Sequence, residues 1–223
     1  MTILILAQQF FPDSVGGSAR VAFDQARELT RRGHTVIAIV PKVTKIAHEV
    51  ETLEGISLYR YGTGTPHFLG QSFTDRTQSA SILRRIVAEH AIDIILAHQP
   101  TVGFVAAMVA PTTKMVYMFH ASVPQEIKFQ GLTGRGRGWK RLFFWIFIRW
   151  MKQMELRVIE RAQKILVLSE YSKKLCNELY AKSRTLPLQK ITTGIDTNLF
   201  SPPDSKKAVR ARIGIPEEMM MFL

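Results

Sequence analysis

The sequence predicts an α/β fold in which a doubly wound, mainly parallel sheet is flanked by helices. Short continuous apolar runs, typical of strands buried on both faces of a parallel sheet, recur along the chain. Stretches with helical spacing separate most of them, and this alternation with short connections is the pattern of a doubly wound sheet. Ligands of such sheets bind at the carboxyl ends of the strands, so we expect the functional site in the loops that follow them.

The expected strands are runs rich in Ile, Val and Leu. They cover residues 3–7, 35–40, 56–61, 92–97, 115–119, 165–168 and 190–195. The first helix follows the first strand, with Ala22, Phe23 and Ala26 on one face, Arg20 and Arg27 on the other, and a glycine at its end. A second helical pattern surrounds residues 82–87. Residues 139–163 predict a long helix that is both basic and aromatic.

Length and charge narrow the class of protein. With 223 residues, 46% of them apolar, the chain can bury one large core or two small ones. It carries 30 basic and 18 acidic residues, a formal charge of +12. This excess favours anionic partners such as nucleotides, phosphorylated substrates, nucleic acid or an anionic membrane, and charge alone does not choose among them.

The cysteine count and the apolar runs predict a cytoplasmic protein. Cys176 is the single cysteine, which excludes an intramolecular disulfide and indicates a reducing compartment. Residues 1–9 lack a basic leader and a cleavage site, so we interpret them as a buried strand. The longest strongly apolar stretch, 142–148, is far shorter than the roughly 20 residues of a membrane-spanning helix. Peripheral association with the inner face of the cell membrane stays open.

The composition changes near residue 200. We expect residues 1–200 to form one domain, and 201–223 to hold an interdomain linker and the first strand of a second domain that the sequence does not contain. The run 219–223 is that expected strand. The alternative is that it forms an edge strand of a complete single domain.

Two adjacent glycines, Gly16 and Gly17, stand between the first expected strand and the first expected helix. Their amides and that of Ser18 can face outward at a helix N-terminus, which carries about half a positive charge. We therefore expect these three residues to bind a phosphate group, with Ser18 also capping the helix. A tight turn without a ligand is an equally good explanation. The absence of G-x-G-x-x-G and of a Walker motif disfavours an NAD-dependent dehydrogenase and a P-loop ATPase.

Two histidines end expected strands. His120 follows the strand at 115–119, and His98 follows the strand at 92–97, so both are expected at the ligand-facing rim of the sheet. His120 is the candidate catalytic residue, and a structural hydrogen-bonding role is the alternative. No pair of histidines or carboxylates has metal-ligand spacing, so we expect no metal site and no metal cofactor.

The stretch 134–153 has basic but no acidic residues around a core rich in Trp and Phe. An interfacial membrane helix has this composition, with cations for lipid phosphates and tryptophans at headgroup depth. A buried helix with basic ends is the equally supported alternative, and nucleic-acid binding lacks an accompanying recognised fold. The candidate membrane or acceptor residues are Arg135, Arg137, Trp139, Lys140, Arg141, Trp145, Arg149 and Trp150.

Four segments occur in order along the chain: FFPDSVGGSARVAFDQARELTRRGHTVIAIVP, VYMFHAS, ERAQKILVLSEYSKKL and ITTGIDTNLFSP. In order and spacing they resemble the N-terminal half of retaining family 4 glycosyltransferases of the GT-B fold, which have two Rossmann-like domains. The resemblance implies that Gly16 and Gly17 approach the donor diphosphate and that His120 contacts the donor sugar. At Thr193 this sequence departs from the family, which usually has Asn before this glycine.

The resemblance implies that this chain is the acceptor-side half of a transferase, inactive by itself. The nucleotide-sugar donor is expected on the missing second domain, together with the cations that assist the leaving diphosphate. The acceptor is expected to be a glycan or a lipid-linked molecule, with an anionic membrane as a further partner and no nucleic acid. The alternatives are an acceptor-binding or scaffold protein without catalysis, and a GT-B-fold nucleotide-sugar epimerase.

Overall fold

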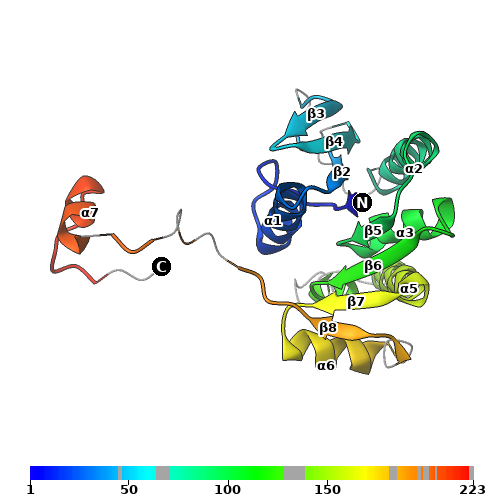
Figure 1. The fold of residues 1–223 in the computed structure, drawn as a ribbon. Helices are drawn as coiled ribbons and strands as arrows, with labels where there is room; N and C mark the ends of the chain where they lie inside the picture. The colour runs from blue at the N-terminus through cyan, green and yellow to red at the C-terminus, as the bar shows by residue number, and fades with distance from the viewer. Residues whose placement is uncertain are drawn as a thin grey trace. The chain divides into compact units, whose positions relative to one another are not determined.

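The computed structural model divides into two compact units, Met1–Thr192 and Thr193–Leu223 (Figure 1). It describes residues 1–44, 47–63, 71–127, 139–180, 185–194, 197, 201–203 and 205–220. The first unit is an α/β domain that contains every strand of the described chain. The predicted fold class is therefore confirmed.

Within the described residues, the first unit holds an eight-stranded sheet in the order β3-β4-β2-β1-β5-β6-β7-β8. Neighbouring strands are parallel except for β3 and β4, which form an antiparallel edge pair. The chain moves outward from β1 in both directions, so the order of the sheet reverses between β1 and β5. The bounds are β1 Thr2–Leu6, β2 Thr35–Pro41, β3 Val50–Leu53, β4 Ile56–Tyr61, β5 Ile94–Ala97, β6 Lys114–Phe119, β7 Lys164–Val167 and β8 Leu188–Lys190.

Helices cover both faces of the sheet, with α1 on one face and α2, α3 and α5 on the opposite one (Figure 1). Alternate residues of β1 divide between these layers: Ile3 and Ile5 pack with α1, whereas Leu4 and Leu6 belong to the core beneath the other helices. The helices are α1 Gly17–Arg31, α2 Gln71–Glu89, α3 Pro100–Val109, α4 Val123–Ile127, α5 Trp139–Arg161, α6 Glu170–Leu179 and α7 Lys206–Arg212.

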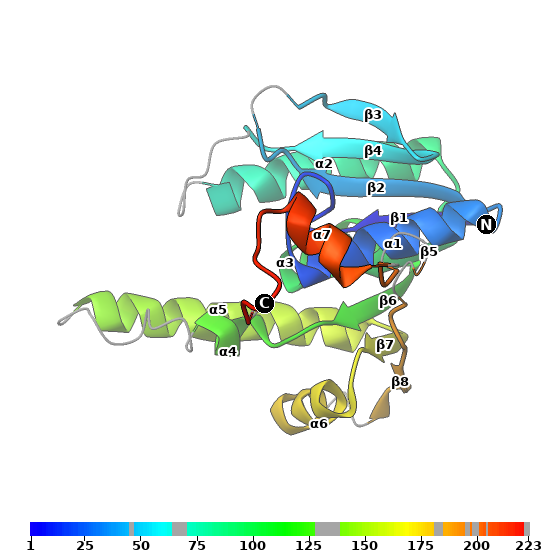
Figure 2. The same cartoon turned by 90° about the vertical axis from the view of Figure 1, so that its left-hand side faces the viewer.

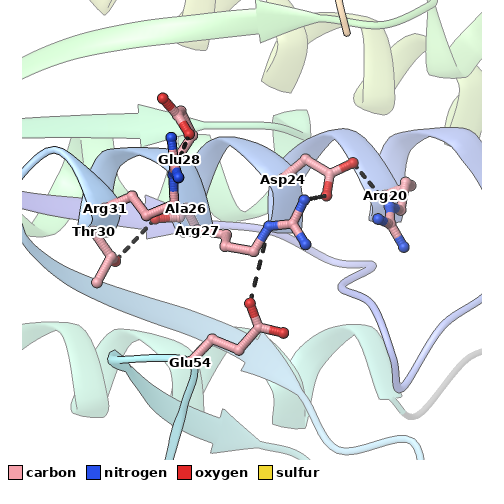
Figure 3. Close-up of polar contacts among 8 residues, drawn as sticks. All are labelled: Arg20, Asp24, Ala26, Arg27, Glu28, Thr30, Arg31 and Glu54. Carbon is pink, nitrogen blue, oxygen red and sulfur yellow. Dashed lines mark hydrogen bonds and ion pairs between the residues drawn. The ribbon is translucent and has the colours of Figure 1, made fainter. Parts of the chain in front are cut away.

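The first helix forms as its sequence pattern predicts. Ala19, Ala22, Phe23 and Ala26 are buried against the sheet. Charged side chains cover the outer face, where Asp24 lies between Arg20 and Arg27 and makes ion pairs with both (Figure 3). Such i, i+3 and i, i+4 pairs add a few tenths of a kcal/mol each to a helix.

The strand predictions were wrong at both edges of the sheet. Strand β3 was not predicted, because its sequence VETL alternates exposed and half-buried residues instead of forming an apolar run. Its connection to β4 is a tight turn through Glu54 and Gly55, both with positive φ. The last strand was predicted over 190–195 but is β8, three residues that end at Lys190.

The second unit contains helix α7, capped by the hydroxyl of Ser205, which accepts a hydrogen bond from the Ala208 amide at 3.2 Å. Arg210 then donates to the carbonyl oxygens of Pro216, Glu217 and Met219, which folds the following segment back on the helix. Met219 and Met220 lie in no strand, and the rest of the strand predicted at 219–223 falls outside the described residues.

Candidate active site

The loops that follow β1, β5 and β6 gather at one edge of the sheet, because β5 pairs in parallel with both β1 and β6. The reversal of strand order between β1 and β5 places this edge at the switch point, where doubly wound sheets bind their ligands. A hydrogen bond joins two of the loops: the Gln8 amide donates to the side-chain oxygen of Gln99 at 2.7 Å. The candidate site is therefore built from these loops.

The glycine pair has two different physical roles. Gly16 has φ 157° and ψ 161°, a conformation that side-chain-bearing residues rarely adopt, so the backbone itself requires glycine here. Gly17 is the first residue of α1, and a Cβ added to it would meet no atom of the described chain within 4 Å. The packing of the chain gives no reason for glycine at position 17, whereas a molecule that approaches the backbone would.

The amides of the first turn of α1 have no partners within the helix, since helix geometry leaves the first N–H groups free. The prediction that Ser18 caps the helix was wrong. The N-cap is Gly16, which has no side chain to accept a hydrogen bond, and Ser18 lies inside the first turn. Its hydroxyl instead donates to the side-chain oxygen of Gln9 at 2.7 Å.

His98 and His120 lie at the ends of β5 and β6 and contact each other. The Nδ1 atom of His98 is 3.1 Å from Nε2 of His120, and the rings stack with their centroids 5.3 Å apart. A hydrogen bond at this distance uses one proton between the two nitrogens. His98 is 1% exposed, and its Nε2 is buried without a hydrogen-bond partner among the described residues.

Burial keeps both histidines neutral. It lowers the pKa of His120 to about 4, and burial together with the neighbouring His120 lowers the pKa of His98 to about 3. Near neutral pH, His120 therefore offers the site a hydrogen-bonding imidazole and no positive charge.

A buried acid lies behind the loop that carries His120. Glu155 of α5 is fully buried and accepts hydrogen bonds from Tyr180 and, at 3.0 Å, from Tyr117. Burial raises the pKa of Glu155 to about 7, although its hydrogen bonds with these tyrosines and with Ser122 oppose the rise. Because Ser122 lies two residues after His120, this network fixes the segment that follows the candidate catalytic residue.

Helix α5 has one buried and one exposed face. Ile148, Met151 and Met154 are buried, whereas Leu142, Trp145 and Ile146 are 61%, 60% and 52% exposed. The N-terminal part of α5 extends past the carboxyl ends of β6 and β7, so the exposed face begins on the same side of the sheet as the candidate site (Figure 2).

The predicted basic and aromatic residues of this region fall into three groups. Arg149 lies over the ring of Trp145, and Trp150 packs beneath Arg76, with guanidinium-to-ring distances of 5.7 and 4.7 Å. Trp139, Lys140 and Arg141 belong to the first turn of α5, and their side chains are not among those described. Arg135 and Arg137 fall outside the described residues. No helix of the described chain combines the length and the apolar character needed to cross a membrane.

Fold and site together define the class of protein: an α/β domain with its polar loops collected at the switch point of a doubly wound sheet. The chain belongs to glycosyltransferase family 4, because the model of Glycosyltransferase Family 4 matches residues 15–199. A comparison with curated proteins found no significant match.

Solved structures of GT-B glycosyltransferases share the fold. Sucrose-phosphate synthase from Thermosynechococcus elongatus has a TM-score of 0.78 and 15% identity over 97% of this chain and 53% of its own. HepE from Anabaena, solved with UDP and glucose, has a TM-score of 0.59 and 18% identity over 96% of this chain and 50% of its own. A glycosyltransferase from Rickettsia africae has a TM-score of 0.56 and 16% identity over 97% and 50%. The chain thus spans about half the length of these structures.

The sequence patterns did not single out Glu155 or Arg60, whose acidic and basic side chains are buried in the core of the described chain. A signal existed for each. Glu155 lies four residues after the buried Met151 and three before the buried Val158, hence on the apolar face of its helix. Arg60 interrupts the apolar pattern of a strand between two tyrosines. Charges at such positions require partners from elsewhere in the fold.

Proposed function

We propose that this chain forms the acceptor-side half of a retaining glycosyltransferase that transfers a sugar from a nucleotide-sugar to an acceptor. Membership of family 4 supports transfer of a sugar, and the match to about half of each solved relative supports the assignment to one half of a GT-B enzyme. The single observation that carries the proposal is the open space at Gly17, at the N-terminus of a helix beside the switch point.

In the proposed reaction, the amides of Gly16, Gly17 and Ser18 face the donor diphosphate. Negative charge grows on the diphosphate as the bond to the sugar breaks, while the acceptor hydroxyl attacks from the same face. Preorganised amides at a helix N-terminus stabilise such charge without reorganisation. A side chain at position 17 would occupy the space through which the phosphate approaches.

His120 has a different task from the glycine loop. Because its pKa is lowered to about 4, it is neutral near pH 7 and does not neutralise the leaving group. A neutral imidazole is suited to hydrogen-bond a hydroxyl of the donor sugar, and the contact with His98 orients its ring. The proposed catalytic contact is therefore between His120 and the sugar, and the phosphate contact belongs to the glycines.

We infer that a second domain binds the nucleotide and supplies the cations that assist the leaving diphosphate, so that the reaction uses no metal ion. Residues 1–223 by themselves would then release little or no nucleotide from UDP- or GDP-sugars in the presence of membrane lipids. Steady, protein-dependent release would overturn this inference.

The glycine loop can be tested by NMR titration of the 223-residue chain with inorganic pyrophosphate. The expected result is a set of saturable shifts at the amides of Gly17 and Ser18, lost in Gly17→Val. Gly194→Val is the matched control, because a Cβ at Gly194 also meets no described atom within 4 Å. If pyrophosphate shifts neither amide, or if Gly17→Val binds as well as the original chain, the loop does not face the diphosphate.

Product analysis of a reaction containing this chain and its donor-binding partner domain separates the remaining alternatives. A new glycosidic bond on the acceptor supports transfer with retention when the anomeric configuration of the donor is kept. An altered sugar nucleotide without acceptor modification would indicate an epimerase, and binding of acceptor without any product would indicate a scaffold.

A lipid-linked or membrane-associated acceptor is proposed from the exposed face of α5. Leu142, Trp145 and Ile146 place apolar surface beside Arg149, the combination that anionic lipid surfaces attract. Flotation with vesicles containing anionic lipid is expected to retain the protein at low salt, and Trp145→Ser should weaken this retention. Tyr171→Ser removes an even more exposed aromatic ring, 73% against 60%, from α6 and should not weaken it. Retention that is absent, or equal in both variants, would contradict the proposal.

A further inference from the structure

Arg60 is a buried arginine that lies outside the strand-end site and hydrogen-bonds to residues of other parts of the chain. The side chain of Arg60, near the end of β4, is 3% exposed. Its Nε donates to Asp13 Oδ2 at 2.8 Å, its Nη2 to Glu51 Oε1 at 2.6 Å, and its Nη1 to the carbonyl oxygen of His48 at 3.3 Å. The fork of one guanidinium thus connects β4 to two other segments of the chain, the loop that holds Asp13 and the stretch 48–51 that leads into β3.

One of these segments is the loop that ends in the glycine pair, residues 8–16. Phe10 anchors its beginning, because its ring is buried and packs edge-on against Phe23 of α1 at 5.6 Å between centroids. A turn follows, in which the Ser14 amide donates to the Phe10 carbonyl oxygen at 2.8 Å. Asp13 lies inside this turn, so its bond to Arg60 attaches the turn to β4, two strands away from β1.

We propose that Arg60 is a positioning residue for the glycine loop: through Asp13 it holds Gly16 and Gly17 in the conformation that receives the donor diphosphate. This inference rests on the proposed function of the loop. Arg60 remains charged, because its hydrogen bonds with Glu51 and Asp13 outweigh its burial and raise its pKa. The pair therefore also compensates the negative charge that Asp13 would otherwise present close to a phosphate.

The two acidic partners of Arg60 allow a test, because a positioning role and simple charge repulsion predict opposite changes in pyrophosphate binding. The substitutions Asp13→Asn and Glu51→Gln each remove one negative charge. Both keep the size of the side chain and leave the guanidinium of Arg60 in place. If these acids only repelled anions, both substitutions would strengthen pyrophosphate binding. If Arg60 positions the loop through Asp13, only Asp13→Asn should weaken binding, since Asp13 is part of the loop whereas Glu51 belongs to β3.

The experiment combines two NMR measurements on the folded 223-residue chain. In pyrophosphate titrations, Asp13→Asn is expected to raise the dissociation constant about tenfold, and Glu51→Gln to leave it unchanged or lower it. In hydrogen exchange without ligand, Asp13→Asn should accelerate exchange of the Ser14 amide, and Glu51→Gln should not.

Each outcome decides one question. Equal or tighter binding by Asp13→Asn, or unchanged exchange at Ser14, overturns the positioning role of Arg60. A failure of the unsubstituted chain to bind pyrophosphate overturns the proposed function of the loop instead. In that case the exchange measurement alone still decides whether Arg60 holds the loop. Thermal unfolding of both variants verifies that each retains the fold.

Discussion

Two buried polar clusters lie in opposite halves of the sheet, and they solve the burial of charge differently. Around Arg60, on the side of β2 and β4, a cation is paired with two carboxylates. Around Glu155, on the side of β6 and β7, an acid is held by tyrosine hydroxyls, with no cation among the partners given by the described residues. Opposite charges compensate one another in the first cluster, whereas neutral donors surround the acid in the second.

This difference determines which half of the site changes its protonation state near physiological pH. Hydrogen bonds and ion pairing outweigh burial and raise the pKa of Arg60, so its guanidinium stays charged at every ordinary pH. Burial raises the pKa of Glu155 to about 7, so its proton is lost close to physiological pH. The glycine loop is thus fixed by permanent charge, and the segment around His120 and Ser122 is fixed by groups that titrate.

The largest expected effect is that of Arg60→Met, which leaves Asp13 and Glu51 without their cation. Removing one partner from a buried ion pair typically costs 3–5 kcal/mol, and we expect a loss of about 4 kcal/mol in the free energy of unfolding. Urea denaturation measures it. Arg157→Met is the control, because Arg157 and Glu160 form an exposed pair at 3.8 Å, and a change within about 0.5 kcal/mol is expected. Equal losses in both variants would contradict the central role of Arg60.

The second effect concerns Glu155, whose contribution to the free energy of unfolding depends on pH. The folded pKa of Glu155, about 7, lies above the reference value of 4.5. Between these values the folded state binds more protons than the unfolded state, so the free energy of unfolding falls as pH rises. Relative to Glu155→Gln, the original chain should therefore lose about 3 kcal/mol between pH 4.5 and 7. A difference that does not change over this range would show that folding does not raise the pKa of Glu155.

For His120 we expect the opposite dependence: the free energy of unfolding rises with pH. Its folded pKa of about 4 lies below the reference value of 6.5, so the unfolded state binds more protons between them. Stability from the neutral imidazole is present above pH 6.5 and is lost as pH falls towards 4. Relative to His120→Gln, the original chain should lose about 2 kcal/mol on this acidification, allowing for partial exposure of the ring. Glu155→Gln should still lose stability as pH falls towards 4, so this variant distinguishes the titration of His120 from that of Glu155.

The sequence predicted the centre of the sheet better than its edges or its polar core. Central strands such as β1 and β2 are continuous apolar runs because both of their faces are buried. The edge strand β3 has one exposed face and lacks that pattern. Strand-end positions for His98 and His120 followed from the strands, but their 3.1 Å contact depends on the pairing of β5 with β6.

The contacts that fix the site could not be read from local patterns. Arg60 and Asp13 are 47 positions apart, and Tyr117 and Glu155 are 38 apart. Helical and strand periodicities extend over a few residues, so they place a charge on a buried face without identifying its partner. In Glu155 the signal was also obscured, because the surrounding helix is rich in basic residues and was interpreted as a possible membrane surface.

The smallest expected effect comes from comparing the N-termini of two helices, α6 in the half of the sheet near Glu155 and α1 in the other half. Helix α6 is capped by Ser169, whose hydroxyl accepts a hydrogen bond from the Ser172 amide at 3.0 Å. Helix α1 begins at Gly17, and its N-cap, Gly16, makes no side-chain cap, which leaves the first amides available to a ligand. Ser169→Ala should therefore cost about 1 kcal/mol of unfolding free energy in urea denaturation. Ser18→Ala removes a hydroxyl that, within the described part of the chain, donates to an exposed glutamine side chain, and it should cost less than half as much. If Ser18→Ala were as costly as Ser169→Ala, Ser18 would be supporting the start of α1, and the amides of its first turn would be less free to receive a phosphate than the glycine pair implies.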